Sequence, residues 1–297
     1  MSALQTRTGL GILLALTGGL LISIDIPVIR LAQSDPWLVM FMRGFGMMSV
    51  LGLLMLFGRK LTDTPPDPFR DKQWVEVGIL YSMTSVFFAL AVFSTSTANL
   101  VFILAFNPMA AAIFAWILIG EKPDIVTWIA IGLTMLGVSV IVSDGLTGGT
   151  LTGDLFALAA AVTLAFGLVR TRQSGKDMSL TPVFAGMLNC LFALPMVILY
   201  SSFPGVPVWL GVNVIIIAPM AGFVFSLAPR FIPAPQVAMF FLLETVLAPI
   251  WTWMIFAEIP SDQTLVGGAI VLLAIAAHSA WQLTKGAKSR RLRAATA

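Results

Sequence analysis

The chain has 297 residues, of which 58% are hydrophobic and only 10% are charged, and its mean hydropathy is +0.96. A soluble domain carries about 25% charged residues, so this composition excludes an ordinary soluble enzyme or binding module. The single cysteine excludes an internal disulfide, and the formal net charge of +3 carries no information about a substrate.

Ten continuous apolar runs follow one another along the chain. A bilayer core about 30 Å thick needs about 20 apolar residues per helix, and these runs lack the alternation of barrel strands. The sequence therefore predicts an all-α membrane protein with ten transmembrane helices. The predicted helices cover residues 9–31, 37–58, 75–94, 97–120, 125–143, 152–170, 182–201, 210–229, 235–257 and 263–283.

Lys and Arg predict the orientation of these helices. With the N-terminus in the cytoplasm, 15 of the 17 basic residues fall on the inner side; Arg30 lies near an outer loop and Arg43 within a span. The positive-inside rule thus predicts a multi-pass protein of the cell (inner) membrane with both termini cytoplasmic. The basic tail, residues 285–297, is interpreted as a stop signal that contacts anionic lipid headgroups, not as a nucleic-acid site.

One motif nearly recurs. The pattern Trp-x₄-Glu-x-Pro at residues 116–123 returns 137 positions later at residues 253–260. Carried back through the preceding apolar run, the same shift pairs Asn107 with Glu244. Internal repeats in a membrane protein are typical of secondary transporters, whose substrate site lies between the halves.

A second echo, at a shift of 142, links residues 11–30 with residues 153–172. The chain is therefore divided into two repeats, residues 1–146 and residues 147–297, with five predicted helices each. Because five is odd, the second repeat should be inverted in the membrane relative to the first. The first Trp-x₄-Glu-x-Pro element then faces the cytoplasm and the second faces outside.

Three charged side chains lie well inside the predicted spans: Asp25, Arg43 and Glu244. Each costs about 2.5–3.5 kcal/mol at mid-bilayer, so each should face protein or water. Asp25 and Arg43 both fall in the outer half, so they can form an ion pair that either fixes helix packing or acts as a gate. Glu244 lies near mid-membrane at the depth of Asn107, where it is either part of a cavity floor or a buried structural acid.

Prolines and aromatic residues complete the candidate site. Pro27, Pro108 and Pro249 interrupt spans beside polar groups and are candidate hinges. Phenylalanines and a tyrosine at mid-span predict a roomy cavity with few polar groups, with lipid or core packing as the alternative for each ring. The candidate cavity-lining residues are Tyr81, Ser85, Asn99, Phe102, Phe106, Asn107, Phe166, Phe240 and Glu244.

Signals for catalysis are absent from the sequence. His278 is the only histidine, so no histidine metal cluster exists, and the glycines lie inside apolar runs instead of phosphate-binding loops. The sequence therefore predicts no enzyme, no metal and no cofactor. The expected partners are a small-molecule substrate and the lipid bilayer, without nucleic acid; the oligomeric state is open, and a monomer satisfies the pattern.

The chain resembles the drug/metabolite transporter superfamily, in its EamA-like branch. The first half carries that pattern in Gly11 with Ala15 and Leu16, Asp35 and Pro36 with Arg43, Asn107 with Pro108, and Gly120 to Pro123. The second half carries it in Gly153 with Ala157 and Leu158, Thr181 with Pro182, Glu244, and Ala257 to Pro260. The second copy departs where Asn189 replaces the arginine and Thr245 replaces the proline.

The resemblance implies ten helices in two inverted five-helix repeats around a central cavity, working by alternating access. Within the family the chain is most similar to exporters of aromatic amino acids that also extrude methyl viologen. The expected function is export of amino acids, aromatic ones above all, or of related small metabolites. The alternatives are a multidrug exporter with Glu244 as the counter-charge to a cation, and a membrane scaffold or channel that does not transport. The sequence leaves the natural substrate, proton coupling and the resting conformation open.

Overall fold

The computed structural model describes most of the chain. The described residues are 2–53, 70–120, 122, 124–148, 150–176, 178, 180–201, 207–228 and 234–295. Glu121, Pro123 and the ends of two predicted runs, at residues 54–58 and 229, lie outside them. Within the described ranges every regular element is a helix.

The helices follow the predicted runs in chain order. The first half contains α1 (Ser2–Ser23), α2 (Asp25–Leu31), α3 (Pro36–Gly46), the π-helical turn η1 (Met47–Leu51), α5 (Lys72–Ser94), α6 (Thr97–Leu104), α7 (Asn107–Ile119) and α8 (Ile125–Gly148). The second half contains α9 (Leu151–Ser174), α10 (Thr181–Tyr200), α11 (Val208–Val212), the π-helical turn η3 (Asn213–Ile217), α12 (Ala218–Leu227), α13 (Ala234–Phe256) and α14 (Asp262–Ala295).

Seven of the described helical segments are long and apolar enough to cross a membrane, and three shorter apolar segments accompany them at Pro36–Leu51, Leu243–Phe256 and Asp262–His278. Large apolar side chains face outward, as Ile198 and Leu199 do with 73% and 71% of their surface exposed. In water such a surface would be an aggregation hazard, whereas in a bilayer it contacts lipid. The all-helical membrane class is thus confirmed, and the inverted relation between the halves stays a prediction.

Local chemistry sets where several helices begin and end. Oδ1 of Asp35 accepts hydrogen bonds from two first-turn N–H groups of α3, both at 3.0 Å, and Oγ of Ser96 accepts one at the start of α6. These side chains satisfy backbone donors that have no partner within the helix. Gly120 and Gly175 end α7 and α9 with φ of 77° and 63°, a conformation that glycine adopts without strain.

Two spans are interrupted close to a polar residue. The break between α1 and α2 falls at Ile24, just before Pro27, and the break between α6 and α7 falls just before Pro108. Pro249 behaves differently, because α13 continues through it without a break. The break expected beside Glu244 is therefore wrong. A proline removes one backbone donor, and packing on both sides keeps this helix intact.

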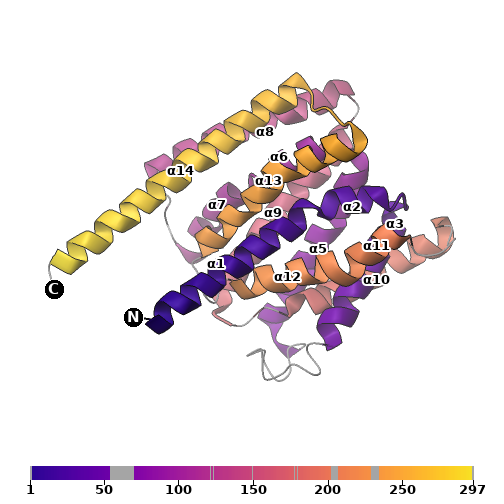
Figure 1. Ribbon diagram of the computed structural model, residues 1–297, viewed down its shortest axis with the longest axis horizontal. Helices are drawn as coiled ribbons and strands as arrows, with labels where there is room; N and C mark the ends of the chain where they lie inside the picture. The colour runs from indigo at the N-terminus through magenta and orange to yellow at the C-terminus, as the bar shows by residue number, and fades with distance from the viewer. Residues whose placement is uncertain are drawn as a thin grey trace.

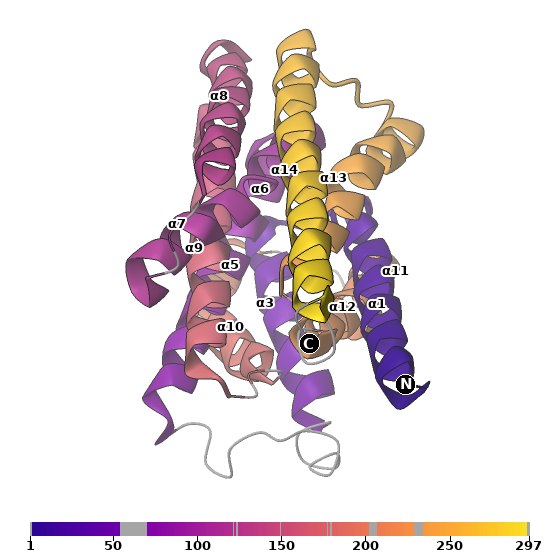
Figure 2. The same ribbon diagram turned by 90° about the vertical axis from the view of Figure 1, so that its left-hand side faces the viewer.

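Backbones approach closely at two helix crossings. A Cβ placed on Gly137 of α8 would lie 2.7 Å from the carbonyl oxygen of Gly267 on α14, and one on Gly267 would lie 2.6 Å from that of Gly137. Gly44 of α3 and Gly186 of α10 show the same reciprocal contact, at 2.7 and 2.6 Å. Small residues permit such packing in membranes, where no hydrophobic drive pulls helices together. Figures 1 and 2 show α8 and α14 side by side at the outside of the bundle.

The two termini lie at the same end of the molecule (Figures 1 and 2). We call this the terminal end. The opposite end, called the distal end, carries the connection between α13 and α14, which Figure 2 shows far from both termini. The turn between α5 and α6, at residues 95–96, also lies at the distal end because Glu258 of the α13–α14 connection contacts it.

Candidate functional site

A closed set of hydrogen bonds joins Asp25, Arg43 and Asn213. Nη1 of Arg43 donates to Oδ1 of Asp25 at 2.7 Å and to Oδ1 of Asn213 at 2.6 Å, and Nδ2 of Asn213 donates to Oδ1 of Asp25 at 2.7 Å. Asp25 is 5% exposed and Asn213 is fully buried. The ion pair expected from the sequence is therefore present, and it includes an amide from the second half of the chain.

Irregular backbone presents these three side chains to one another. Asp25 is the first residue of α2, directly after the break at Ile24. Arg43 lies in the last turn of α3, and Asn213 begins the π-helical turn η3. Single π-helical turns inside α-helices are frequent at functional sites. Each of the three groups thus sits where the regular helix ends or changes.

Glu244 of α13 completes the group, which we call the central cluster: Asp25, Arg43, Asn213 and Glu244. Glu244 is 9% exposed, and its carboxyl lies within electrostatic range of Asp25 and Arg43. Among the described residues, its carboxyl takes part in no hydrogen bond. The central cluster therefore holds two acidic groups and one basic group.

Arg43 also has hydrogen-bond donors that are not used in the bonds to described residues. Both of its hydrogen bonds to described residues come from Nη1, so Nε and Nη2 are not engaged by them. The ring of Phe88 on α5 lies 5.7 Å from Cζ of Arg43, within the range of a cation–π contact. The central cluster thus combines free donors, a free acidic acceptor and an aromatic ring.

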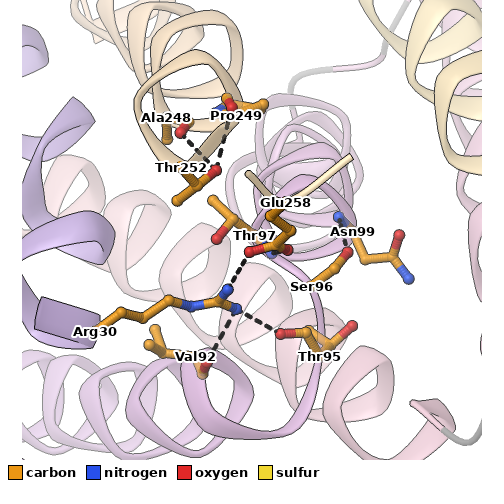
Figure 3. Close-up of polar contacts among 10 residues, drawn as sticks. All are labelled: Arg30, Val92, Thr95, Ser96, Thr97, Asn99, Ala248, Pro249, Thr252 and Glu258. Carbon is orange, nitrogen blue, oxygen red and sulfur yellow. Dashed lines mark hydrogen bonds and ion pairs between the residues drawn. The ribbon is translucent and has the colours of Figure 1, made fainter. Parts of the chain in front are cut away.

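A second ionic group closes the distal end (Figure 3). Arg30, at the end of α2, forms an ion pair with Glu258, and Nη2 of Arg30 donates to the carbonyl oxygens of Thr95 at 2.7 Å and Val92 at 3.3 Å. The other oxygen of Glu258 accepts from the N–H of Thr97 at 2.8 Å, at the N-terminus of α6. We call these five residues the distal cluster. It ties α2, α5, α6 and the end of α13 together.

Asn99 belongs to a neighbouring buried network. Its Nδ2 donates to Asp154 of α9 at 3.3 Å, and its Oδ1 accepts from Thr264 of α14. Asp154 is fully buried and also accepts from Oγ1 of Thr95. These hydrogen bonds join α6, α9 and α14 next to the distal cluster, and a cavity-lining role for Asn99 stays a prediction.

Other predicted cavity residues also make packing contacts. The hydroxyl of Tyr81 lies 3.1 Å from Oγ1 of Thr171 on α9, and its ring packs on Gly167 of the same helix. Nδ2 of Asn107 donates to the carbonyl oxygen of Ala161 on α9 at 3.1 Å, rather than to Glu244. Ser85 is half-buried on α5. The amide of Asn107 is thus bonded to α9, and a cavity floor shared by Asn107 and Glu244 stays a prediction.

The phenylalanines that were predicted to line the cavity also make packing contacts. Phe102 and Phe106 are each 8% exposed within the main hydrophobic core, and Phe102 packs against Gly268 of α14. Phe166 forms an edge-to-face pair with Phe114, with ring centroids 5.2 Å apart. Phe240 is half-buried against a small core between α1, α12 and α13. Their contacts are those of helix packing.

Three features were missed from the sequence. Asn213 is a lone amide in the apolar run of residues 208–228, which was a usable signal. Asp154 stands at the start of a predicted span, and its burial was not predicted. The pairing of Arg30 with Glu258 joins residues far apart in sequence, and only the fold brings them together. In the part of the chain that the structure describes, no group of three His, Cys, Asp or Glu side chains could hold a metal ion.

The apolar helices and the buried central cluster define the class of protein: a multi-pass, helical membrane protein with ionisable groups buried between its spans. Residues 9–143 match the model of the EamA-like transporter family, so the first half of the chain is similar to that family. No curated protein matched the chain. A solved structure titled "Crystal structure of protein" shares the fold, with a TM-score of 0.64 and 15% identity over 90% of this chain and 96% of that one. At this identity the likeness concerns the fold alone.

Proposed function

We propose that the protein is a secondary transporter that exports amino acids, aromatic ones among them, or related small metabolites by alternating access. One observation carries this proposal. The central cluster is assembled from both halves of the chain, with Asp25 and Arg43 from the first and Asn213 and Glu244 from the second. Ionisable groups inside a membrane protein are costly and mark substrate or ion pathways. Transporters built from repeats bind their substrates at the interface between the repeats.

The proposed architecture is ten helices in two inverted repeats, residues 1–146 and 147–297. The crossing of Gly44 and Gly186 supports it. Gly44 and Gly186 lie 142 positions apart, the same shift as the second sequence echo, and each contacts the backbone of the other. A reciprocal contact between equivalent residues is what a two-fold axis between the halves produces.

The proposed topology places the terminal end in the cytoplasm. The described basic residues outside the two clusters gather on segments at that end. They are Arg7, Arg70, Lys72, Lys122, Arg170, Arg172, Lys176, Lys285, Lys288, Arg290, Arg291 and Arg293. The positive-inside rule then assigns this end to the cytoplasm and the distal end to the outside of the cell (inner) membrane.

Alternating access requires one end to open while the other is closed. In the structure the distal cluster holds α2, α5, α6 and α13 together, and we assign it the role of the closed outer gate. The breaks before Pro27 and Pro108 lie on two of the tied spans and are the proposed bending points. The Asp25–Arg43 pair, by contrast, belongs to the solute site in this proposal and does not act as the gate.

Radiolabelled phenylalanine in proteoliposomes tests the proposal. A carrier predicts saturable flux that accelerates when unlabelled solute is present on the opposite side. Non-saturable flux would indicate a channel, and no flux with any small solute would indicate a scaffold.

A second assay tests the gate. Cysteines replace Arg30 and Glu258 in a Cys190→Ala background, and a short cleavable reagent cross-links them. Flux should stop on cross-linking and return when the link is cleaved. Flux that continues through the cross-linked protein rejects alternating access at the distal end.

A further inference from the structure

We infer that Glu244 is the counter-ion for one positive charge on the transported solute, so that the site prefers a protonated amine without a free carboxylate over a zwitterionic amino acid. This inference rests on the proposed function and narrows its substrate class. Three properties of the central cluster carry it: its charges, its unused hydrogen-bonding groups and the aromatic ring beside it.

The charges of the central cluster do not balance. Asp25 and Arg43 neutralise each other in direct contact, and Asn213 is uncharged. Glu244 has no basic partner of its own, although it is buried to 91% and lies within the electrostatic reach of the pair. A buried charge is normally paired and hydrogen-bonded, because the protein interior does not replace the water that it loses.

The helices packed against α13 offer no second cation. α1, α2 and α6 are its main neighbours, and α12 contacts it through the stacked rings of Phe225 and Phe241. From Thr8 to Ser23, α1 has no charged residue, and neither α6 nor α12 has one. On α2 the charged residues are Asp25, already in the central cluster, and Arg30, which is engaged by Glu258 and two backbone carbonyls. Among the described residues, no basic side chain is thus left to pair with Glu244, so a cation that pairs with its carboxylate would come from the solute.

The unbonded groups of the central cluster indicate which other chemical groups the solute carries. An ammonium group donates hydrogen bonds that the unpartnered carboxylate of Glu244 can accept. Nε and Nη2 of Arg43 are available to a neutral acceptor such as a hydroxyl or carbonyl oxygen. A solute carboxylate would also bind there, but its charge would restore the imbalance that the ammonium removes. Phe88, beside Arg43, suits a solute with an aromatic or apolar body.

Phenethylamine and phenylalanine provide the discriminating pair, because they share a ring and an amino group and differ by the carboxylate. We expect the wild-type protein in detergent to bind phenethylamine about tenfold or more tightly than phenylalanine, measured by calorimetry at one pH. Glu244→Gln should weaken phenethylamine binding by about tenfold or more and leave phenylalanine within about threefold. Glu244→Asp, which keeps the charge, should retain the preference for the amine.

Glu76→Gln is the matched control, since Glu76 pairs with Arg170 outside both clusters and its side chain is 39% exposed. It should leave both affinities unchanged. Each variant should first elute as a single folded species in size-exclusion chromatography, so that a change in affinity is not caused by misfolding. Equal binding of the two solutes by the wild type, no binding of either, or an unchanged preference in Glu244→Gln overturns the inference. Saturable phenylalanine flux alongside equal binding would leave the proposed function standing, whereas loss of all flux would remove both.

Discussion

The central and distal clusters hold similar groups but use them differently. In the distal cluster both oxygens of Glu258 are bonded, one to Arg30 and one to the N–H of Thr97, and Arg30 also donates to two backbone carbonyls. In the central cluster Arg43 uses one nitrogen for two bonds, and Glu244 has no hydrogen bond to a described residue. The bonded groups of the distal cluster hold helices in place, and the unbonded groups of the central cluster are those that the proposed solute would engage.

Burial separates the two clusters as well. The side chains of Arg30 and Glu258 are 20% and 23% exposed, whereas those of Arg43 and Asp25 are 13% and 7% exposed. Water can therefore replace distal contacts when they break, and it does so less readily at the centre. The difference suits a gate that opens and closes at one end and a site that stays charged and dry between the halves.

The largest effect is expected from Arg43→Met, which keeps the bulk of the side chain and leaves two buried carboxylates without a cation. It should lower the free energy of unfolding in detergent by about 3–5 kcal/mol. Arg170→Met is the control, because that pair is more exposed and should lose less than about 1 kcal/mol.

The double variant Asp25→Asn with Arg43→Met sharpens this result. Removal of both charges of a buried pair costs less than removal of one, so part of the lost stability should return. Equal losses in Arg43→Met and Arg170→Met would contradict the distinction between the buried central cluster and an ordinary surface pair.

Glu258→Gln should have an intermediate effect, because it keeps the shape of the distal cluster and removes its negative charge. We expect a loss of about 1.5–3 kcal/mol, the usual value for hydrogen bonds to a charged group. The outer gate should also open more often. A cysteine introduced at Ser96 in the Cys190→Ala background should then react faster with a membrane-impermeant thiol reagent.

The same labelling experiment on Glu76→Gln gives the baseline for the gate. An unchanged labelling rate at position 96 in Glu258→Gln would show that the distal cluster fixes helix packing without controlling access. The contrast between the two clusters would then concern stability alone.

The smallest effect is expected at Asp71 and Lys176, a pair 2.6 Å apart that belongs to neither cluster and in which the side chain of Lys176 is 43% exposed. The hydrogen bond from Lys176 holds the pKa of Asp71 below its ordinary value of 3.8. A lowered pKa in the folded state stabilises the fold above pH 3.8, and that contribution disappears as the pH falls through the folded-state pKa.

Asp71→Asn keeps the helix cap and removes the charge, so at neutral pH it should cost about 0–1 kcal/mol. The difference between this variant and the wild type should shrink as the pH is lowered below 3.8, measured by denaturant unfolding. A difference that grows on acidification would contradict the assigned cause.

The sequence predicted the helical spans well because continuous apolarity is a direct requirement of the bilayer. It also placed Asp25 and Arg43 at similar depths in the membrane, because the rise per residue of a helix converts a position in the sequence into a depth. It could not show that η3 turns Asn213 toward them, because a π-helical turn depends on tertiary packing. It did not reveal that Phe102 packs against Gly268 of α14, because position along a helix does not identify the residue on a neighbouring helix.

The Gly137–Gly267 crossing also bears on how the chain is made. The ribosome completes Gly267 130 residues after Gly137. At about 5–20 residues per second, this delay is roughly 7–26 s. During that interval the glycine face of α8 has no partner helix and lies against lipid or the insertion machinery. Closure of this crossing must therefore wait until α14 has emerged. A nascent chain that stalls before residue 267 would leave a membrane-embedded intermediate in which the backbone groove of α8 is not covered by α14.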